Sequence, residues 1–308
     1  MTGLFLFVFD FVLSRLVHKV KRHKFFESIQ KWSNRKKLIW YVFSIIIIIL
    51  LILIKPVLDN VNDKKVLEEA KQQFLPIPYS VISEAKVDRT LVELQKTLVK
   101  LRDEYIEKPP DYLIKVHLFS NQNEFIQKTG MFELTAGGTL MLPGRPPEVI
   151  IPVEKEKSIW DNTLPTSTPS HEATHVVTFE AMQLKDNNLI PIFYLEGMAE
   201  YESSKDFNRF PDRIFNRIKL ILYKNQLTKL ETIPTLNIKD KSVNDEDILL
   251  FYRLSGEFIR YLIHNYGEHK PWYVVQNVGQ GMNFYEAFKS EYSKEYFATF
   301  SEFLGYFY

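Results

Sequence analysis

The chain contains no cysteine in its 308 residues. Without thiols it can form no disulfide, bind no metal through sulfur and carry no lipid on a cysteine. The sequence also lacks a glycine-rich loop of the kind that binds phosphate, a context typical of a nucleophilic serine, and internal repeats. Beyond the amino-terminal segment there is no basic patch that would indicate nucleic-acid binding. Non-covalent interactions are therefore expected to hold the folded part together.

The string HEATH at residues 171–175 is the most informative motif in the sequence. Residues four apart on an α-helix lie on one face, so His171 and His175 can direct imidazole nitrogens at one ion. A hydrolytic zinc needs a third protein ligand and one open position for water, and a carboxylate from a second helix completes a His2Glu set. Glu196, in the string LEGMAEY, is the natural candidate for that third ligand.

Two further carboxylates are expected beside these ligands. Zinc lowers the pKa of its bound water to about 7, but attack on an amide also needs a base that passes the water's proton to the leaving nitrogen. Glu172, next to the first ligand, suits that role. Glu200 lies one turn after Glu196 on the same helix face, where it can accept the second ring N–H of His171 and fix its tautomer.

The same strings have a simpler interpretation, in which HEATH is an amphipathic helix with two surface histidines and the glutamates form a solvated face. Chance occurrence of H-E-x-x-H in a chain with seven histidines is on the order of one per cent. The helix also carries apolar residues that make it half-buried, where unpaired His and Glu would be costly. These apolar residues are Ala173, Val176, Val177 and Phe179.

Both segments that carry the candidate ligands are predicted to be helical. Thr168 followed by Pro169 is typical of an N-cap and a first helical residue, and starts a helix with the sequence HEATHVVTFEAMQL. That helix is expected to fray at residues 185–188. Pro191 then begins a second helix, at about residues 192–204.

The two strings resemble the signature of the gluzincins, the thermolysin-like and aminopeptidase-like zinc peptidases, in which HExxH is followed by a Glu ligand on the next helix. LEGMAEY is similar to the E-G-x-A-x-Y form of many small membrane or secreted members. A weaker likeness extends over residues 66–308. It is carried by KVHLF (115–119), NEF (123–125), AGG (136–138), VIIP (149–152), YRLSGEFIRYLIHNYG (252–267) and EAF (286–288).

The resemblance implies a Zn2+ ion bound by His171, His175 and Glu196. It also implies that Glu172 is the catalytic base. Many members add a Tyr or His that hydrogen-bonds the oxyanion of the tetrahedral intermediate. Tyr252 is the first candidate for this donor and His264 the second, while core packing is the alternative role for Tyr252. The G-x-M-E-N string of true aminopeptidases is absent, which favours endopeptidase action or a narrow substrate.

Residues 38–54, LIWYVFSIIIIILLILI, are 17 residues without a charge and predict a transmembrane helix at the short end of the spanning range. A cleaved signal peptide is the alternative, but no small-x-small site follows the run. Residues 1–37 carry nine Lys or Arg and two acids, whereas residues 55–308 carry 30 and 36. The positive-inside rule therefore predicts a single-pass protein of the cell membrane, with a cytoplasmic amino terminus and an external metal domain.

We expect an α+β fold, with an N-terminal transmembrane helix followed by a zincin-like metallopeptidase domain that has a small mixed sheet and a helical C-terminal lobe. The predicted divisions are a cytoplasmic basic, amphipathic segment (1–37), the membrane helix (38–54), a stalk (55–78) and the domain (79–308). Within the domain we expect a sheet-containing part (79–165), the metal helices (166–205) and the helical lobe (206–308). The predicted elements are a helix at 87–106, a strand at 113–119, an edge strand and a second strand within 137–153, and helices at 213–227, 247–266, 271–278 and 284–291.

The sequence thus predicts a membrane-anchored, extracytoplasmic zinc metallopeptidase that acts on a peptide or protein, contacts membrane lipid through residues 38–54 and has no nucleic-acid partner. Its Ile-, Lys- and Asn-rich composition suggests a bacterial source. The alternative is a catalytically inactive peptidase-like protein that binds a peptide or partner at the cell surface. A third interpretation is hydrolysis of another amide, such as one in the cell wall.

Overall fold

The computed structural model of the chain divides into two compact units, Met1–Asn62 and Asp63–Tyr308. The residues that it describes are 61–129, 137–154, 168–204, 227–238 and 245–305, with single positions at 44, 48, 55, 240 and 243.

Most of the predicted membrane anchor falls outside these residues. Only Ser44 and Ile48 of the predicted span at 38–54 are described, and both are helical. The basic segment at 1–37 is outside the described part, as is the predicted helix at 213–227 except for Leu227. In the portion of the chain that the structure describes, no helix combines the length and the apolar character that crossing a membrane requires.

The second unit is a mixed α+β structure that is mostly helical and contains a four-stranded sheet in the order β1-β2-β4-β3. The strands are β1 (Phe74–Pro78), β2 (Ile114–Asn121), β3 (Gly138–Leu140) and β4 (Glu148–Glu154). Strands β1, β2 and β4 are parallel, and β3 is antiparallel to β4 at one edge. This confirms the predicted small mixed sheet and the predicted edge strand.

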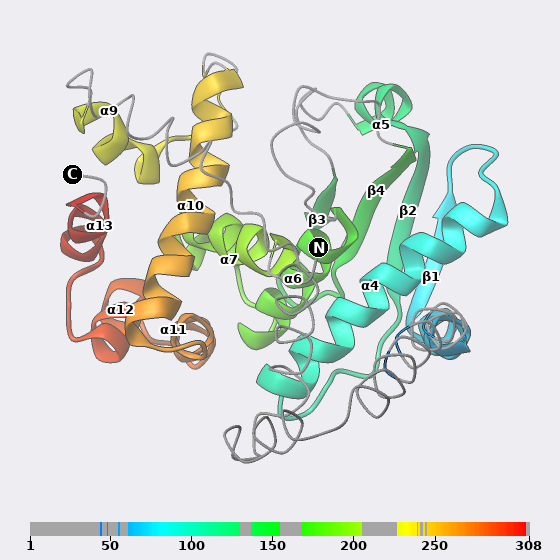
Figure 1. Ribbon diagram of the computed structural model, residues 1–308, viewed down its shortest axis with the longest axis horizontal. Coiled ribbons are helices and arrows are strands. Elements are labelled where there is room, and N and C mark those ends of the chain that lie inside the picture. The colour runs from blue at the N-terminus through cyan, green and yellow to red at the C-terminus, as the bar shows by residue number, and fades with distance from the viewer. Residues whose placement is uncertain are drawn as a thin grey trace, which may run out of the picture. The chain divides into compact units, whose positions relative to one another are not determined.

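The helices with described bounds in this unit are α4 (Glu84–Tyr105), α5 (Gln122–Thr129), α6 (Thr168–Ala181), α7 (Ile192–Ser204), α9 (Leu227–Thr232), α10 (Asp245–Tyr266), α11 (Lys270–Gly279), α12 (Phe284–Tyr292) and α13 (Tyr296–Gly305). Two 3-10 turns lie at Asn187–Leu189 and Ile233–Thr235. Helix α6 packs against α4, the sheet and α7, and α7 packs against α10 (Figure 1). The two helices that carry the candidate ligands are therefore enclosed between the sheet with α4 on one side and α10 on the other.

The sheet has a buried face and an outer face. Val116 and Leu118 of β2 are fully buried, whereas Lys115 between Ile114 and Val116 is exposed. Successive side chains of a strand point to opposite faces, so the buried residues face the helices. On β3, Thr139 faces α6 and hydrogen-bonds it, and its neighbour Leu140 lies on the outer face.

The structure differs from the sequence prediction at the predicted stalk, 55–78. Residues 61–73 are helical, but Phe74–Pro78 form strand β1. Ala70 and Phe74 are buried in the hydrophobic core. Pro76 and Pro78 indicated a break in the helix, but β1 is an edge strand, where a residue without an N–H is tolerated.

Helix α6 also ends earlier than predicted, at Ala181 rather than near Leu184. Gln183 and Leu184 have positive φ angles of 57° and 55°. Their backbone N–H groups donate to Glu180 and Phe179, so the chain turns back on the last helical turn. A left-handed C-terminal cap is usually formed by glycine, and its absence here hid the helix end in the sequence.

A buried ion pair fixes α6 against α4. Arg102 on α4 donates from Nε to a carboxylate oxygen of Glu180 at 2.8 Å, and both side chains are almost fully buried. The Tyr112 hydroxyl donates to the same carboxylate at 2.7 Å. Because these groups satisfy one another inside the core, the pair specifies how α6 lies on α4.

Helices α7 and α10 cross at very close range. A Cβ atom added to Gly197 would lie 2.5 Å from the backbone oxygen of Ser255 and 2.9 Å from Cγ1 of Ile259. A contact under 3.0 Å to a backbone atom cannot be relieved by a side-chain rotation. Gly197 is therefore required for the helix crossing, in spite of the cost of about 1 kcal/mol that glycine carries inside a helix.

Helix α10 buries a carboxyl group between two arginines. Glu257 is 8% exposed, and Arg260 lies 3.7 Å from it. Burial raises the pKa of Glu257 to about 7, although the positive charges of Arg260 and Arg253 act in the opposite direction. At neutral pH this carboxyl group is therefore partly protonated.

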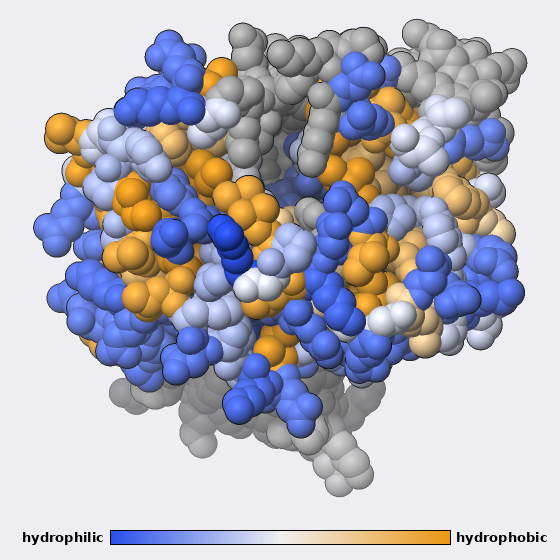
Figure 2. Space-filling view, turned by 180° about the vertical axis from the view of Figure 1, so that it is seen from behind, coloured by the Kyte–Doolittle hydropathy of each residue, from blue (hydrophilic) through white to orange (hydrophobic). Residues whose placement is uncertain are grey.

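The surface of the described residues is mixed in character. On the face seen in Figure 2, hydrophobic side chains form several groups with hydrophilic side chains between them. Scattered apolar residues are normal on a protein surface and need no partner to explain them.

We expect Gly197→Ala to lower the free energy of unfolding by about 1–3 kcal/mol, because the new methyl group overlaps the α10 backbone. Gly305→Ala is the matched control, since a Cβ there meets no atom within 4 Å. Urea unfolding of both variants measures the difference. Equal stability of the two would show that α7 and α10 do not cross as closely as described.

Glu257→Gln tests the buried carboxyl group of α10. The folded chain holds a proton on Glu257 that the unfolded chain releases above pH 4.5, so stability is fully present below that pH and is lost as the pH rises through about 7. The wild type should lose up to about 3 kcal/mol over this range, and Glu257→Gln should lose less. Urea unfolding at about pH 5 and pH 8 measures this loss, with the exposed Glu286→Gln as control. If Glu257→Gln lost as much stability as the wild type between these pH values, Glu257 would not be the group responsible.

Candidate metal centre

The three candidate ligands predicted from the sequence lie together in the structure. Nε2 of His171 is 3.1 Å from Nε2 of His175 and 3.1 Å from Oε2 of Glu196. Nε2 of His175 is 3.3 Å from the same carboxylate oxygen. The three atoms form a nearly equilateral triangle, and the group can hold a metal ion.

The triangle results from the facing of two helices. The four-residue spacing of the histidines places both rings on one side of α6, and they meet edge to face with centroids 4.8 Å apart. Glu196 comes from the second turn of α7, which packs beside α6. The side chains of His171, His175 and Glu196 are largely buried, with exposed fractions of 13%, 8% and 14%.

The electrostatics of the triangle favour a positive charge at its centre. Burial lowers the pKa of His171, but hydrogen bonds with Glu196 and Glu200 outweigh it, so the pKa is raised well above its ordinary value. Burial raises the pKa of Glu196, but the two histidines outweigh it and hold the pKa far below its usual range. The negative charge of the nearby carboxylates can be balanced either by a protonated histidine or by a bound cation. Only a bound cation can contact all three atoms of the triangle at once.

Glu172 lies beside the triangle and is held separately from it. The Thr139 hydroxyl on edge strand β3 donates to Oε2 of Glu172 at 2.8 Å. Glu172 is 4% exposed, and burial raises its pKa above the ordinary value, while His171 and His175 oppose the shift. A carboxylate with a raised pKa is a stronger base than one in water, so this residue is able to accept a proton close to the triangle.

Glu200 lies one turn after Glu196, as the sequence predicts. Its Oε1 is 3.4 Å from Nδ1 of His171, on the side of the ring opposite the triangle. Its other oxygen, Oε2, accepts a hydrogen bond from Nη1 of Arg253 on α10 at 3.1 Å. The carboxylate therefore connects the imidazole of His171 to an arginine on a third helix.

The two candidates for an oxyanion donor lie in different places. The Tyr252 ring is 6.4 Å from the His171 ring, centroid to centroid, so this side chain borders the site. Burial raises its pKa well above the ordinary value, and the site carboxylates add to the shift, so the phenol is protonated at neutral pH. His264 is exposed in the last turn of α10, about 18 Å further along the helix axis. That distance removes His264 from the site.

Sequence reasoning missed two residues that support the site, Thr139 and Arg253. Thr139 directly follows the Gly137-Gly138 segment, which indicated an edge strand but not a contact with α6. Arg253 directly follows Tyr252 in the segment YRLSGEF. Neither carried a local signal, because each partner is distant in sequence, 33 residues away for Thr139 and 53 for Arg253.

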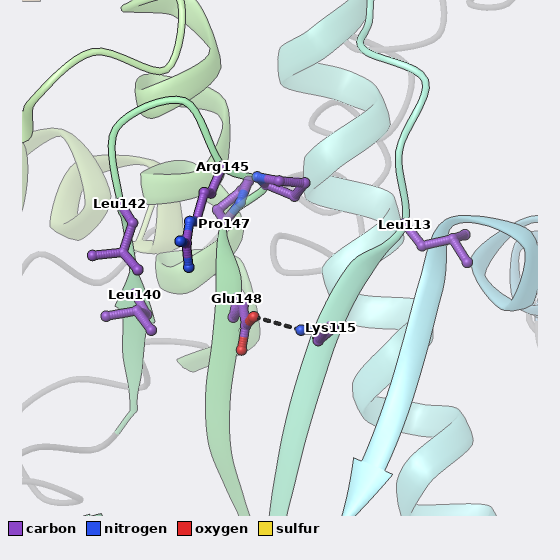
Figure 3. A pocket seen from close by; sticks show the side chains of 8 residues that line it. Leu113, Lys115, Leu140, Leu142, Arg145, Pro147 and Glu148 are labelled. Atoms are coloured by element: carbon purple, nitrogen blue, oxygen red, sulfur yellow. Dashed lines mark hydrogen bonds and ion pairs between the residues drawn. The ribbon is translucent and has the colours of Figure 1, made fainter.

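A separate pocket lies on the outer face of the sheet (Figure 3). Three exposed leucines, Leu113, Leu140 and Leu142, contribute to its lining. Glu148 and Lys115 also line it, and their side chains form an ion pair at 2.8 Å. Because Leu140 and Thr139 point to opposite faces of β3, this pocket opens away from Glu172. It is therefore not part of the metal centre.

Two comparisons with known proteins bear on this chain. Neither the protein-family models nor the curated proteins gave a match to it. What the chain does must therefore be argued from its own residues and their geometry.

Proposed function

We propose that this protein is a zinc metallopeptidase that hydrolyses peptide bonds. The observation that carries the proposal is the buried triangle of two imidazole nitrogens and one carboxylate oxygen, with a second carboxylate held beside it by Thr139. The mixed sheet, with its antiparallel edge strand ahead of α6, is in keeping with the gluzincin resemblance.

The dimensions of the triangle suit zinc. Zn2+ binds imidazole nitrogen and carboxylate oxygen at about 2.0–2.2 Å, so a tetrahedral site has edges of about 3.3–3.5 Å. The observed edges of 3.1–3.3 Å need to lengthen by only about 0.2 Å. Two nitrogen ligands and one oxygen ligand form the His2Glu donor set of hydrolytic zinc, which leaves one position open.

Glu172 is the group that we propose to move the proton. When bound, zinc supplies an acidified water and a Lewis acid that polarises a carbonyl group. Glu172 accepts the proton of the attacking water and delivers it to the amide nitrogen as the C–N bond breaks. Thr139 holds one carboxylate oxygen and leaves the other for this transfer.

Tyr252 is proposed as the donor that stabilises the negative charge of the tetrahedral state. Its phenol is kept protonated by burial, and its ring borders His171. A hydrogen-bond donor that is fixed before the reaction pays little for reorganisation, so it contributes more than a donor in water.

We further propose that residues 38–54 anchor the protein in the cell membrane, with the amino terminus in the cytoplasm and the metal centre outside. The support is the uncharged run and the excess of basic residues before it. A peptide or protein outside the cell is then the substrate.

Glu172→Gln should lower kcat by at least about 100-fold, because an amide cannot accept the proton. Zinc content and melting temperature should stay the same, since Thr139 can still donate to the amide oxygen. Digestion of a peptide library followed by mass spectrometry measures turnover, with the exposed Glu286→Gln as control. Full activity of Glu172→Gln would remove Glu172 from the mechanism. A wild type that binds peptides but cleaves none of them would favour a peptide-binding protein over an enzyme.

Tyr252→Phe keeps the ring and removes only the hydroxyl. We expect kcat to fall by about 100-fold with KM and zinc content nearly unchanged, because the hydroxyl acts on the transition state and not on the bound substrate. Steady-state kinetics on a peptide cleaved by the wild type provide the measurement. An unchanged kcat would mean that Tyr252 is only a packing residue.

A further inference from the structure

The two histidines of the triangle are supported very differently. Nδ1 of His171 faces the carboxylate of Glu200. Nδ1 of His175 is buried and has no hydrogen-bond partner among the described residues. A metal-binding histidine is normally held in its ring orientation by a group that hydrogen-bonds its second nitrogen. Of the two histidines, His171 has such a group, the carboxylate of Glu200.

Glu200 can perform this role only if its own carboxylate is fixed. The side chain is 10% exposed, so most of its surroundings are protein groups. Arg253 is the cation that faces it, with Nη1 at 3.1 Å from Oε2, and the arginine side chain is itself 8% exposed. One carboxylate oxygen therefore faces the histidine and the other accepts from the arginine, which sets the plane of the group.

The position of Arg253 is determined by the close crossing of α7 and α10. Gly256, one turn after Arg253, lies against Glu200, and a Cβ added there would be 3.0 Å from Cβ of Glu200. Gly197 makes the neighbouring close contact with Ser255. The two glycines bring the helix backbones together and place the guanidinium group beside the carboxylate.

A competing carboxylate is available on the same helix. Glu257 lies one turn after Arg253 and interacts with it through its charge, but no hydrogen bond between the two is described, and the ion pair described for Glu257 is with Arg260. The described contact of Arg253 with a carboxylate is with Glu200. The arginine is thus directed at the metal centre and not at its helical neighbour.

We propose that Arg253 is a positioning residue of the metal centre, which orients Glu200 and through it the imidazole of His171 toward the metal. The inference rests on the proposed zinc site. Arg253 touches neither metal nor substrate. Its effect is on how well the site is arranged for the ion before the ion binds.

The test is the affinity of the full-length chain for Zn2+, measured by competition with a chromophoric chelator at constant pH. Arg253→Met removes the charge and the guanidinium donors while it keeps an unbranched stem that can still pack between the helices. We expect it to weaken zinc binding about 10- to 100-fold. Arg253→Lys keeps the charge but not the planar donor geometry, so its affinity should lie between those of Arg253→Met and the wild type.

Arg260→Met is the matched control, because Arg260 lies on the same helix and pairs with Glu257. We expect it to bind zinc within about threefold of the wild type. A double-variant cycle then separates positioning from a general loss of structure. Once Glu200→Gln is present, addition of Arg253→Met should weaken binding by no more than about threefold, since the group that the arginine orients has already changed.

Three results would overturn the inference: Arg253→Met binds zinc as tightly as the wild type, Arg260→Met weakens binding equally, or the effects of Glu200→Gln and Arg253→Met multiply. If Arg253→Met fails to fold, Arg253→Lys decides, and an affinity equal to that of the wild type in spite of its lost donor geometry also counts against the role. A wild type that binds no zinc would overturn the proposed function as well. A wild type that binds zinc, with an unaffected Arg253→Met, would overturn this inference alone.

Discussion

The packing of α6 against α7 is the constraint on which the rest of the site depends. It brings Glu196 to within 3.3 Å of two histidines on a neighbouring helix and removes all three from most of the solvent. Polar groups buried in this way are costly unless they satisfy one another or a bound ion. The surrounding structure serves to hold this arrangement, through Arg102 and Glu180 on the α4 side and the glycine contacts on the α10 side.

The two glutamates beside the triangle, Glu172 and Glu200, have pKa values that shift in opposite directions. Glu172 is held by a neutral hydroxyl on the sheet edge, and burial raises its pKa. Glu200 is held by an arginine and a histidine, and these outweigh burial and lower its pKa. Two glutamates on adjacent helices therefore have different chemistry. The pKa of Glu172 is raised, whereas Glu200 is held in its ionised form beside the imidazole of His171.

Much of this arrangement was predictable from the sequence where the signal is local. Helix α7 matches its predicted range, 192–204, because Pro191 marks its start and its apolar residues repeat with helical period. The histidine pair needed only the four-residue spacing. Strand β1 was missed because Pro76 and Pro78 disfavour a strand except at an edge, and the edge is set by tertiary structure. Thr139 and Arg253 were missed because their partners are distant in sequence.

The central claim is that His171, His175 and Glu196 bind one zinc ion. Elemental analysis of the purified full-length chain beside His175→Ala, at near-neutral pH after removal of loose metal, tests it most directly. We predict about one zinc per chain in the wild type and almost none in the variant, since two ligands bind far more weakly than three. A well-folded wild type without zinc, or a variant that retains it, would contradict the claim.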